Sequence, residues 1–462
     1  MTKLTSTNPA KNYSVIGEVT VSSEAEIVER VKRANDAKKE WSEIGIQKRI
    51  ACVKRLYDLC KEQARNIAST ITKEVGTPFT ASLDEVLWNK GYFEWFLHNV
   101  ESAIISQIVG KDEQSVHKVY YEPIGTAAVI TPWNLPFDMF VWGAIPNLLV
   151  GNTVVYKAAE ECALTGKLLE EIVEKANFPH GVFSFVHGGA KEGATLTDQD
   201  IDLIWFTGST EVGQLLYQKA AKKFIKAILE MGGSNPVIIF EDADIDSAVA
   251  GVLLKRFMFC GQTCDADKRL MIHESVFDTV IKKLSEKISA MVIGDPENPK
   301  TAIGPLVSKK QLDLLESQVL DAVQKGATVV TGGKKPAGFK GAYYAPTLLT
   351  NINPAMRVWT EEVFGPVLVA IPFHSDDQAV RMANHTMYGL GSQIFTKDVG
   401  RMNKVSQAIQ AGNVDVNGVG HFKPFNPFGG YKKSGMGREH GIEGFRELCQ
   451  VKTVSSPRSL GV

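Results

Sequence analysis

The sequence lacks several features that would assign a protein to a class directly. It has 6 cysteines in 462 residues, which is too few and too dispersed for a disulfide-stabilised scaffold. No apolar run approaches the ~18 residues of a membrane-spanning helix, and the first residues have no signal-peptide core. We therefore expect free thiols, no membrane association and a cytoplasmic location.

An excess of either charge is also missing, because 51 Lys and Arg face 52 Asp and Glu, with a net charge of −1. A nucleic-acid-binding protein normally carries a basic excess, so no nucleic-acid partner is expected. The histidines and cysteines form no cluster that would complete a zinc site, so no metal is expected. Length and a 44% hydrophobic content suit a globular protein of two or three domains.

Helical periodicity and short apolar runs alternate along most of the chain. Helices are predicted at 25–41, 49–75, 165–176, 193–196, 248–259 and 276–291, and strands at 125–131, 152–157, 182–187, 203–206, 236–240, 268–272 and 327–331. This alternation predicts an α/β fold with a doubly wound parallel sheet, followed by a second α/β unit. The segments 115–122 and 449–455 alternate like edge strands with no helix after them, and such strands often pair outside their own domain. Ordinary surface strands are the alternative.

Three motifs far apart in the chain carry the chemistry. Cys264 follows a Gly-Gln-Thr turn, Glu230 precedes a glycine pair, and Asn134 lies between two prolines in Thr131–Pro136. A soft nucleophile, a base and a neutral hydrogen-bond donor are the parts that covalent chemistry on a carbonyl requires. Buried structural cysteine, a helix-end charge and a loop amide are the simpler interpretations of each residue taken alone.

In this order the motifs resemble the aldehyde dehydrogenase superfamily, nearly end to end, and Asn417 and the segment 427–438 match its late motifs. The resemblance implies that the Cys264 thiolate adds to an aldehyde and that Asn134, with the Cys264 backbone N–H, stabilises the oxyanion. It implies that Glu230 activates water on the resulting thioester. Relatives that use coenzyme A generally lack this glutamate, so hydrolysis to a free acid is expected.

The same resemblance implies a domain organisation. Residues 1–113 and 126–235 would form a cofactor-binding domain and residues 236–445 a catalytic domain. Residues 114–125 and 446–462 would form a β-strand arm, with the last strand reaching a neighbouring subunit. The expected partner is therefore a second copy of the chain, in a homodimer or homotetramer.

No Gly-x-Gly-x-x-Gly fingerprint follows the first predicted strand. The segment 206–213 instead contains a glycine-rich turn between strand and helix, which predicts a phosphate site or, as the alternative, only a tight turn. The residues expected to bind NAD, most of them through the resemblance, are Trp133, Lys157, Glu160, Gly208, Ser209, Gly213, Glu362 and Phe364. A carboxylate at Glu160 would bind the adenosine ribose and repel a 2′-phosphate, which favours NAD while leaving NADP possible.

Met139, Trp142 and Phe422 are predicted to line the substrate entrance. Relatives specialised for succinic semialdehyde often have an arginine where Trp142 stands, to bind the distal carboxylate. Aromatic and apolar walls favour an aliphatic or aromatic aldehyde, and Asp138 disfavours an anion. The alternatives are that Arg256 or Lys423 supplies the missing cation, or that Trp142 only packs in the core.

Asp265, directly after the nucleophile, departs from the small or apolar residues common there in the family. An interaction of ~1.4 kcal/mol with the thiolate would raise the thiol pKa by about one unit. Phe259 and Cys260 also depart from a segment that commonly carries Asn, whereas Arg269 fits a basic position and is expected to be structural.

We therefore predict NAD-dependent oxidation of a small or medium aldehyde to its carboxylic acid. The alternative within the class is a semialdehyde dehydrogenase that uses NADP. The alternatives from other classes are a nucleotide-independent cysteine esterase and a non-catalytic scaffold.

Overall fold

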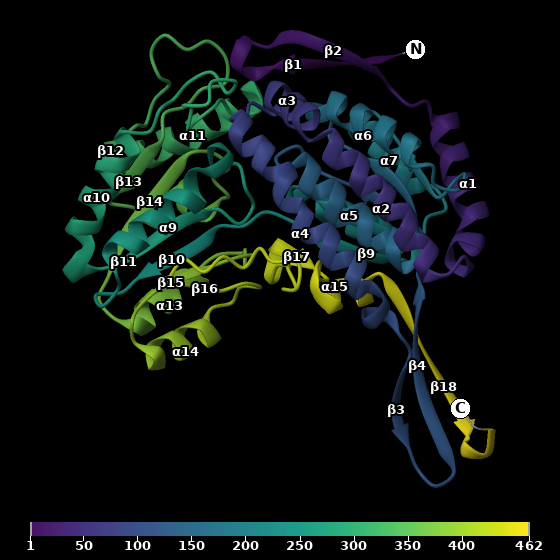
Figure 1. Cartoon of the computed structure of the whole chain (residues 1–462). Helices are drawn as coiled ribbons and strands as arrows, with labels where there is room; N and C mark the ends of the chain where they lie inside the picture. The colour runs from purple at the N-terminus through teal and green to yellow at the C-terminus, as the bar shows by residue number, and fades with distance from the viewer. Residues whose placement is uncertain (1, 461–462) are drawn as a thin grey trace.

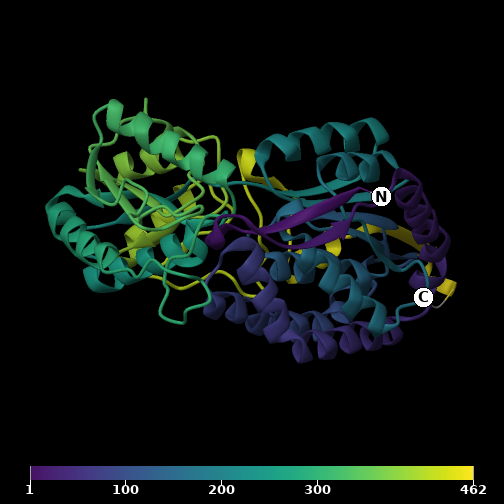
Figure 2. The ribbon, with the colours of Figure 1, turned by 90° about the horizontal axis from the view of Figure 1, so that it is seen from above.

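The computed structural model describes residues 2–460, which form two α/β lobes side by side with a long β-strand arm below the first lobe (Figure 1). Seen from above, the two lobes lie at the ends of an elongated body (Figure 2). The N-terminal hairpin of β1 (Lys3–Asn8) and β2 (Ser14–Thr20) lies across the first lobe. Its turn contacts the second lobe, where the Ala342 N–H donates to the Pro9 carbonyl.

The first lobe contains a six-stranded sheet, ordered β17–β9–β8–β5–β6–β7. All pairs are parallel except β17 with β9. The strands are β5 (Thr126–Ile130), β6 (Thr153–Lys157), β7 (Phe183–Phe185), β8 (Leu203–Thr207), β9 (Lys226–Glu230) and β17 (Gly435–Met436). The chain proceeds from β5 through β6 to β7, and then returns to place β8 on the other side of β5. Ligands of doubly wound sheets bind where the strand order reverses in this way, here between β5 and β8.

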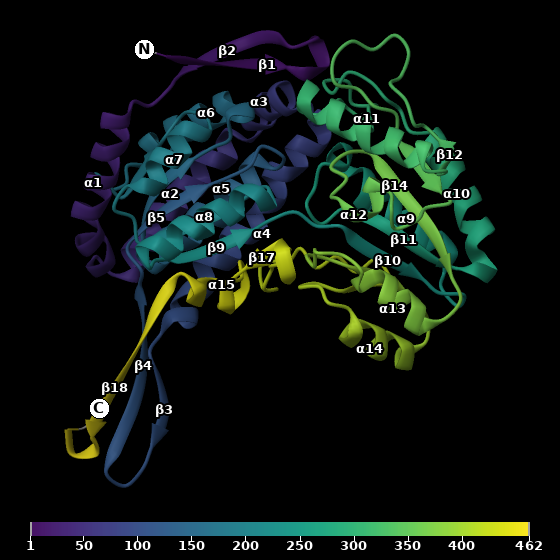
Figure 3. The same ribbon diagram turned by 180° about the vertical axis from the view of Figure 1, so that it is seen from behind.

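Helices cover both faces of this sheet (Figures 1 and 3). They are α1 (Glu24–Glu43), α2 (Ile46–Glu62), α3 (Ala64–Val75), α4 (Phe79–Ile104), α5 (Pro136–Val150), α6 (Ala163–Ala176), α7 (Ala190–Asp198) and α8 (Thr210–Lys223). The helix α5 is buried along its whole length and packs against α4 and β6. Because α5 is apolar on every side, its sequence has no amphipathic pattern, and no helix was predicted there.

The second lobe is built on a seven-stranded sheet ordered β12–β13–β14–β11–β10–β15–β16, parallel except for the edge strand β12. Its strands are β10 (Asn235–Ile239), β11 (Asp267–His273), β12 (Thr328–Thr331), β13 (Thr347–Thr350), β14 (Val367–Phe373), β15 (Gln393–Phe395) and β16 (Asp415–Val416). Its helices are α9 (Ile245–Phe257), α10 (Phe277–Ser289), α11 (Lys309–Gln324), α12 (Arg357–Thr360), α13 (Asp376–Asn384) and α14 (Val399–Ala408). The α/β fold predicted from the sequence is confirmed.

The arm is a three-stranded antiparallel sheet of β3 (Gln107–Lys111), β4 (Ser115–Pro123) and β18 (Cys449–Pro457), with β4 in the centre. The strands β4 and β18 match the two predicted edge strands, whereas β3 lies outside the segment predicted for the arm. Before β18 the chain returns to the first lobe, where β17 pairs with β9 and α15 (Gly441–Glu447) packs on α4 and α5.

Two helix predictions were wrong at their boundaries. The predicted helix 49–75 is two helices, because Gln63 leaves the helical conformation at φ −93° and ψ 6°. Neither glycine nor proline marks this break, and the apolar periodicity continues across it. The predicted helix 248–259 ends at Phe257, because Phe259 and Cys260 adopt left-handed φ values of 51° and 58°. Within residues 2–460, no helix combines the length and apolarity needed to cross a membrane.

Candidate active site

A cavity of about 670 Å³ lies between the two lobes. The first lobe contributes residues at the carboxyl ends of its strands, among them Asn134 after β5, Gly208 after β8, and Glu230 at the end of β9. The second lobe contributes residues that precede its strands, including Cys264 before β11 and Glu362 before β14. Chain segments more than two hundred residues apart are thus brought into one site by the two sheets.

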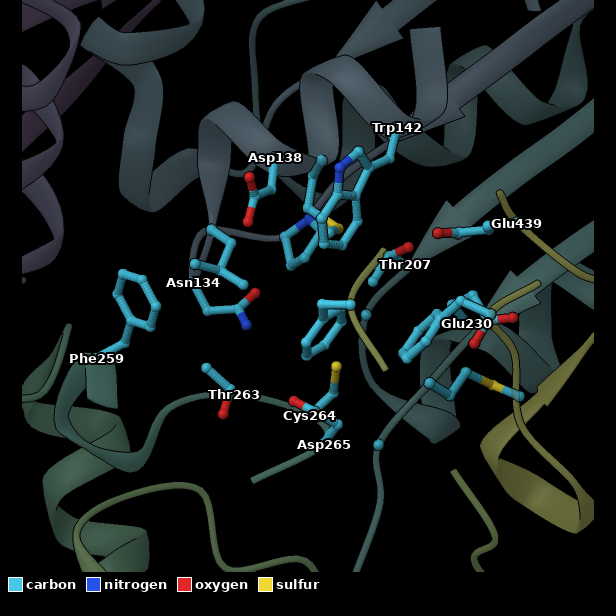
Figure 4. A pocket seen from close by; sticks show the side chains of 18 of the residues that line it. Asn134, Asp138, Trp142, Thr207, Glu230, Phe259, Thr263, Cys264, Asp265 and Glu439 are labelled. Atoms are coloured by element: carbon cyan, nitrogen blue, oxygen red, sulfur yellow. The ribbon is translucent and has the colours of Figure 1, made fainter. Parts of the chain in front are cut away.

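Cys264 lies at the floor of this cavity with its sulfur pointing inward (Figure 4), and it is the only one of the described cysteines that is partly exposed rather than fully buried. Its carbonyl accepts hydrogen bonds from Asn235 Nδ2 at 2.9 Å and from Lys268 Nζ at 2.8 Å. These bonds fix the backbone that carries the sulfur. Burial and the adjacent Asp265 carboxylate raise the pKa of the Cys264 thiol, and the Lys268 ammonium opposes this increase.

Asn134 extends into the cavity from the loop after β5 (Figure 4). Its Nδ2 donates one hydrogen bond to the Gln262 carbonyl, two residues before Cys264, at 3.0 Å. Gln262 is itself held in place, because its Oε1 accepts from the Val307 N–H at 3.0 Å. A side-chain amide has two N–H donors, so one donor of Asn134 remains for a group in the cavity.

Glu230 is only 2% exposed, and neither of its carboxylate oxygens has a hydrogen-bond partner among the described residues. A second buried carboxylate, Glu439, lines the same cavity, and sequence reasoning missed it (Figure 4). Burial raises the pKa of Glu230, and the nearby Glu439 raises it further. Burial also raises the pKa of Glu439 to about 8. The two carboxylates therefore carry less negative charge near neutral pH than two exposed glutamates would.

Most of the residues predicted to bind the cofactor line the cavity, namely Trp133, Gly208, Ser209, Glu362 and Phe364. Ser209 caps the N-terminus of α8, which points an anion-binding helix end toward the site. The edge of the Trp133 ring meets the Phe364 ring, with centroids 5.6 Å apart. At Gly232 an added Cβ would lie 2.0 Å from Glu362 Oε2, so only glycine allows Glu362 to reach this position.

Lys157, Glu160 and Gly213 lie outside the lining of the cavity. Lys157 ends β6 and is 4% exposed, and the Ala158 carbonyl, at 3.2 Å, is the only partner of its ammonium within residues 2–460. Glu160 follows on the surface, close to Gly189. A buried ammonium with spare donors, an exposed carboxylate and a capped helix end fit the ribose and phosphates of a dinucleotide. Gly213 instead allows α8 to approach Met231, whose Sδ would lie 2.1 Å from an added Cβ.

Lys268 is a second residue that sequence reasoning missed. It is 2% exposed, and its Nζ donates to Glu362 Oε1 at 2.6 Å, to the Gly233 carbonyl at 2.5 Å and to the Cys264 carbonyl. The ammonium thereby joins the segment with the nucleophile to the one with Glu362. Its position four residues after Cys264 placed it in β11, but no sequence pattern indicated these three partners.

Met139, Trp142 and Phe422 all line the cavity. The Trp142 ring stacks against the Phe422 ring, with centroids 5.9 Å apart, and contacts the Tyr92 ring, with centroids 5.1 Å apart. Trp142 therefore packs in the core and also forms a wall of the site.

The possibility that Arg256 supplies a cation to this site is wrong, because Arg256 is fully buried and donates to the Val363 and Gly365 carbonyls. It does not line the cavity. Lys423 does line the cavity, and its side chain is exposed. Arg269 is structural as expected, since its guanidinium binds the carbonyls of Ser234, Met382 and Ala383.

The fold and the site define a two-lobed α/β protein whose cavity holds a partly exposed cysteine next to residues that fit a dinucleotide. The model of the aldehyde dehydrogenase family matches residues 1–454. A glutarate-semialdehyde dehydrogenase from Pseudomonas aeruginosa is 34% identical over 96% of this chain and 92% of its own length. The chain belongs to the aldehyde dehydrogenase family.

Two solved structures are similar over almost the whole chain. One is an NADP-dependent enzyme from E. coli, with a TM-score of 0.95 and 32% identity, covering 99% of this chain and 95% of the other. The other is an aldehyde dehydrogenase from Bacillus cereus in complex with NAD+, with a TM-score of 0.95 and 31% identity, covering 99% and 93% of the two chains.

Proposed function

We propose that this protein oxidises an aldehyde to its carboxylic acid with NAD as the acceptor, through a covalent intermediate on Cys264. The observation that carries the proposal is the cavity that unites a thiol, a free amide donor, an unpartnered carboxylate and the residues suited to a nicotinamide nucleotide. A scaffold protein has no need of this combination, and an esterase has no need of the nucleotide residues.

The Cys264 thiolate adds to the aldehyde carbon, and the carbonyl oxygen becomes an oxyanion. The free N–H of Asn134 donates to that oxygen, in a site where such a donor is worth ~2.7–4 kcal/mol of barrier. A bound nicotinamide would supply the acceptor for the hydride of the former aldehyde carbon, and loss of that hydride would leave a thioester on Cys264. The side chains of Trp133, Glu362 and Phe364 would hold the nicotinamide end of the cofactor.

Glu230 completes the cycle. Ionised Glu230 takes a proton from a water molecule whose oxygen adds to the thioester carbon, and the Cys264 thiolate then leaves. The acid is released, and the proton passes from Glu230 to solvent. Over one cycle, aldehyde, NAD+ and water give acid, NADH and a proton.

The test is NADH formation from a neutral aldehyde, measured by absorbance, with the variants Cys264→Ala and Cys260→Ala compared. Cys260 is a matched control because it is buried four residues away, and its thiol donates to the Gly304 carbonyl. Loss of activity in the first variant alone supports the proposal. Turnover by Cys264→Ala, or no NADH from any aldehyde, would refute it.

For the cofactor we propose a preference for NAD over NADP, with the exposed Glu160 carboxylate at the end of β6 disfavouring a 2′-phosphate. Its test is kcat/KM with each cofactor in the protein and in Glu160→Gln, where the preference should shrink. An unchanged preference would contradict the role of Glu160. A semialdehyde dehydrogenase that uses NADP remains the second candidate, supported by the two relatives named for those properties.

We propose further that the protein is a cytoplasmic homodimer or homotetramer. Free thiols at every described cysteine suit a reducing compartment. The arm carries the exposed apolar side chains Ile108, Val109, Val451 and Val454, and such side chains favour association. Sedimentation equilibrium of the protein and of Val451→Asp tests the assembly. A monomer before substitution would contradict it.

A further inference from the structure

The cavity that would hold the aldehyde substrate is lined by several buried carboxylates, and no buried Lys or Arg is among the described residues that line it. Asp138, Asp265 and Glu439 line the cavity in addition to Glu230 and Glu362. Among the described lining residues the only Lys or Arg is Lys423, whose side chain is exposed. Glu362 is paired with Lys268, and Asp265 lies 3.5 Å from Lys255 Nζ, whereas Asp138 and Glu439 form no ion pair with a Lys or Arg among the described residues. An unpaired buried carboxylate is costly unless a bound group or protonation compensates its charge.

Asp265 is one of these carboxylates. It is 4% exposed, lies next to the nucleophile, and its Oδ2 has no hydrogen-bond partner among the described residues. Lys255 Nζ lies 3.5 Å from Asp265 Oδ2, within ion-pair distance, and His421 Nε2 lies 3.6 Å from it. Neither forms a hydrogen bond with Asp265, because both residues bind Asp415 Oδ2, at 2.8 Å and 2.9 Å. Asp265 is therefore oriented by its neighbours and still free to accept a bond from a ligand.

Asp138 is the second carboxylate, in the first turn of α5. It is fully buried, and its Oδ1 accepts from Trp88 Nε1 at 2.7 Å and from Asn89 Nδ2, whereas its Oδ2 has no partner in residues 2–460. Glu85, also fully buried, lies close by and accepts from the Asp138 N–H at 3.2 Å. Burial raises the pKa of Asp138 to about 8. A positive charge at this point would let Asp138 ionise.

Aromatic rings form the remaining wall. The Trp142 ring contacts the rings of Tyr92 and Phe422, with centroids 5.1 Å and 5.9 Å away. The Phe428 ring contacts Phe422 in turn, with centroids 5.4 Å apart. All four residues line the cavity. The faces of such rings attract cations, and most strongly where water is excluded.

The carboxylates converge on this wall. Burial raises the pKa of Tyr92, and the charges of Asp138, Glu439 and Asp265 raise it further. The Tyr92 hydroxyl is buried without a partner among the described residues. Three acidic side chains from different elements are thus close enough to Tyr92 for their charges to act on its hydroxyl.

We infer that the cavity selects an aldehyde whose far end is an ammonium cation, and that Asp138 and Asp265 are the specificity-determining residues. The inference rests on the proposed function, since it assigns the cavity beyond Cys264 to the aldehyde. The ammonium binds against the aromatic wall with the two carboxylates as counter-charges. An aldehyde with a carboxylate tail meets like charges and finds no buried Lys or Arg among the described residues that line the cavity, so a semialdehyde is a poor substrate.

The test compares pairs of aldehydes that differ in charge and have the same shape. One pair is trimethylammonio-acetaldehyde and 3,3-dimethylbutanal, and the longer pair is 4-trimethylammonio-butanal and 5,5-dimethylhexanal. We expect kcat/KM to be about 10- to 100-fold higher for the cation in at least one pair, mostly through a lower KM. Succinic semialdehyde should be a poorer substrate than either neutral aldehyde.

Two variants locate the effect. The control is Asp246→Asn, because Asp246 is exposed at the start of α9, where it pairs with Lys283 and does not line the cavity. In Asp265→Asn and in Asp138→Asn, the ratio of kcat/KM for the cation to that for its neutral partner should fall about tenfold. The control should keep the ratio. If Asp138→Asn does not fold, Asp265→Asn and inhibition of the unsubstituted protein by tetramethylammonium still test the inference.

The possible results separate this inference from the function on which it rests. If no aldehyde reduces NAD, the proposed function fails. If neutral aldehydes are oxidised while the cations show no advantage, or succinic semialdehyde is preferred, the function stands and the inference is overturned. A cation preference that survives both substitutions also overturns the assignment to Asp138 and Asp265.

Discussion

Replacement of Glu439 by glutamine is expected to move the pH dependence of thioester hydrolysis toward acid. Glu230 can act as a base only when it is ionised, so hydrolysis increases as the pH rises through its pKa. Burial raises that pKa, and Glu439 raises it further. Glutamine keeps the size of Glu439 and removes its charge, so the pKa of Glu230 should fall in Glu439→Gln.

The structure gives reason to expect a large effect. Both glutamates are at most 4% exposed, and no donor within residues 2–460 bonds to either oxygen of Glu230. When two carboxylates share one buried site, the repulsion between their charges separates their pKa values by about one to three units. A fall of one unit corresponds to ~1.4 kcal/mol and raises the ionised fraction of Glu230 about tenfold on the acidic side of its pKa.

Stopped-flow measurement of NADH resolves this step, because a burst reports acylation and the slower phase that follows reports hydrolysis. The rate constant of the slow phase is measured as a function of pH in the unsubstituted protein, in Glu439→Gln and in the control Glu443→Gln. Glu443 is an exposed glutamate of the same segment. The midpoint is the pH at which this rate constant reaches half its maximum. We expect the midpoint to fall by at least about one unit in Glu439→Gln alone. A midpoint that stays in place or rises would refute the electrostatic reasoning.

Three further predictions concern the nucleophile and its surroundings. Cys264→Ser should abolish the burst, whereas Cys260→Ser should retain it, and the burst amplitude per subunit measures this. Asn134→Ala should slow acylation by about 10²- to 10³-fold through loss of the oxyanion donor, and an unaltered burst rate would contradict that role. Lys268→Met should raise the thiol pKa and Asp265→Asn should lower it, because a cation and an anion near a thiolate act in opposite directions. The rate of alkylation by iodoacetamide against pH gives both pKa values, and shifts in the same direction would show that the two charges do not govern the thiol.

The sequence predicted the candidate site well where local motifs decide the position. Asn134, Glu230 and Cys264 each stand at a strand end or in a turn, and the carboxyl ends of β5 and β9 place the first two in one cavity with the third. Turn residues and buried strands are local features, so they could be recognised along the chain. The alternation of strands and helices likewise specified the doubly wound sheet.

Residues that act through distant partners could not be predicted in this way. Glu439 lies more than two hundred residues after Glu230, and only the return of the chain through β17 brings it into the cavity. Lys268 stands close to the nucleophile in sequence, but its partner Glu362 comes from the segment before β14. The alternative that Arg256 supplies a cation fails for the same reason, because its buried position depends on the Val363 and Gly365 carbonyls of that segment.

The partition of roles between Cys264 and Glu230 is tested most directly by trapping the intermediate. Glu230→Gln keeps the thiol and the oxyanion donor and removes the base, so acylation should proceed without hydrolysis. After mixing with a neutral aldehyde and NAD+, we predict about one NADH per subunit and an acyl group on Cys264, located by mass spectrometry of the acid-quenched protein. Continued turnover by Glu230→Gln, or NADH formation with no adduct on Cys264, would contradict this account.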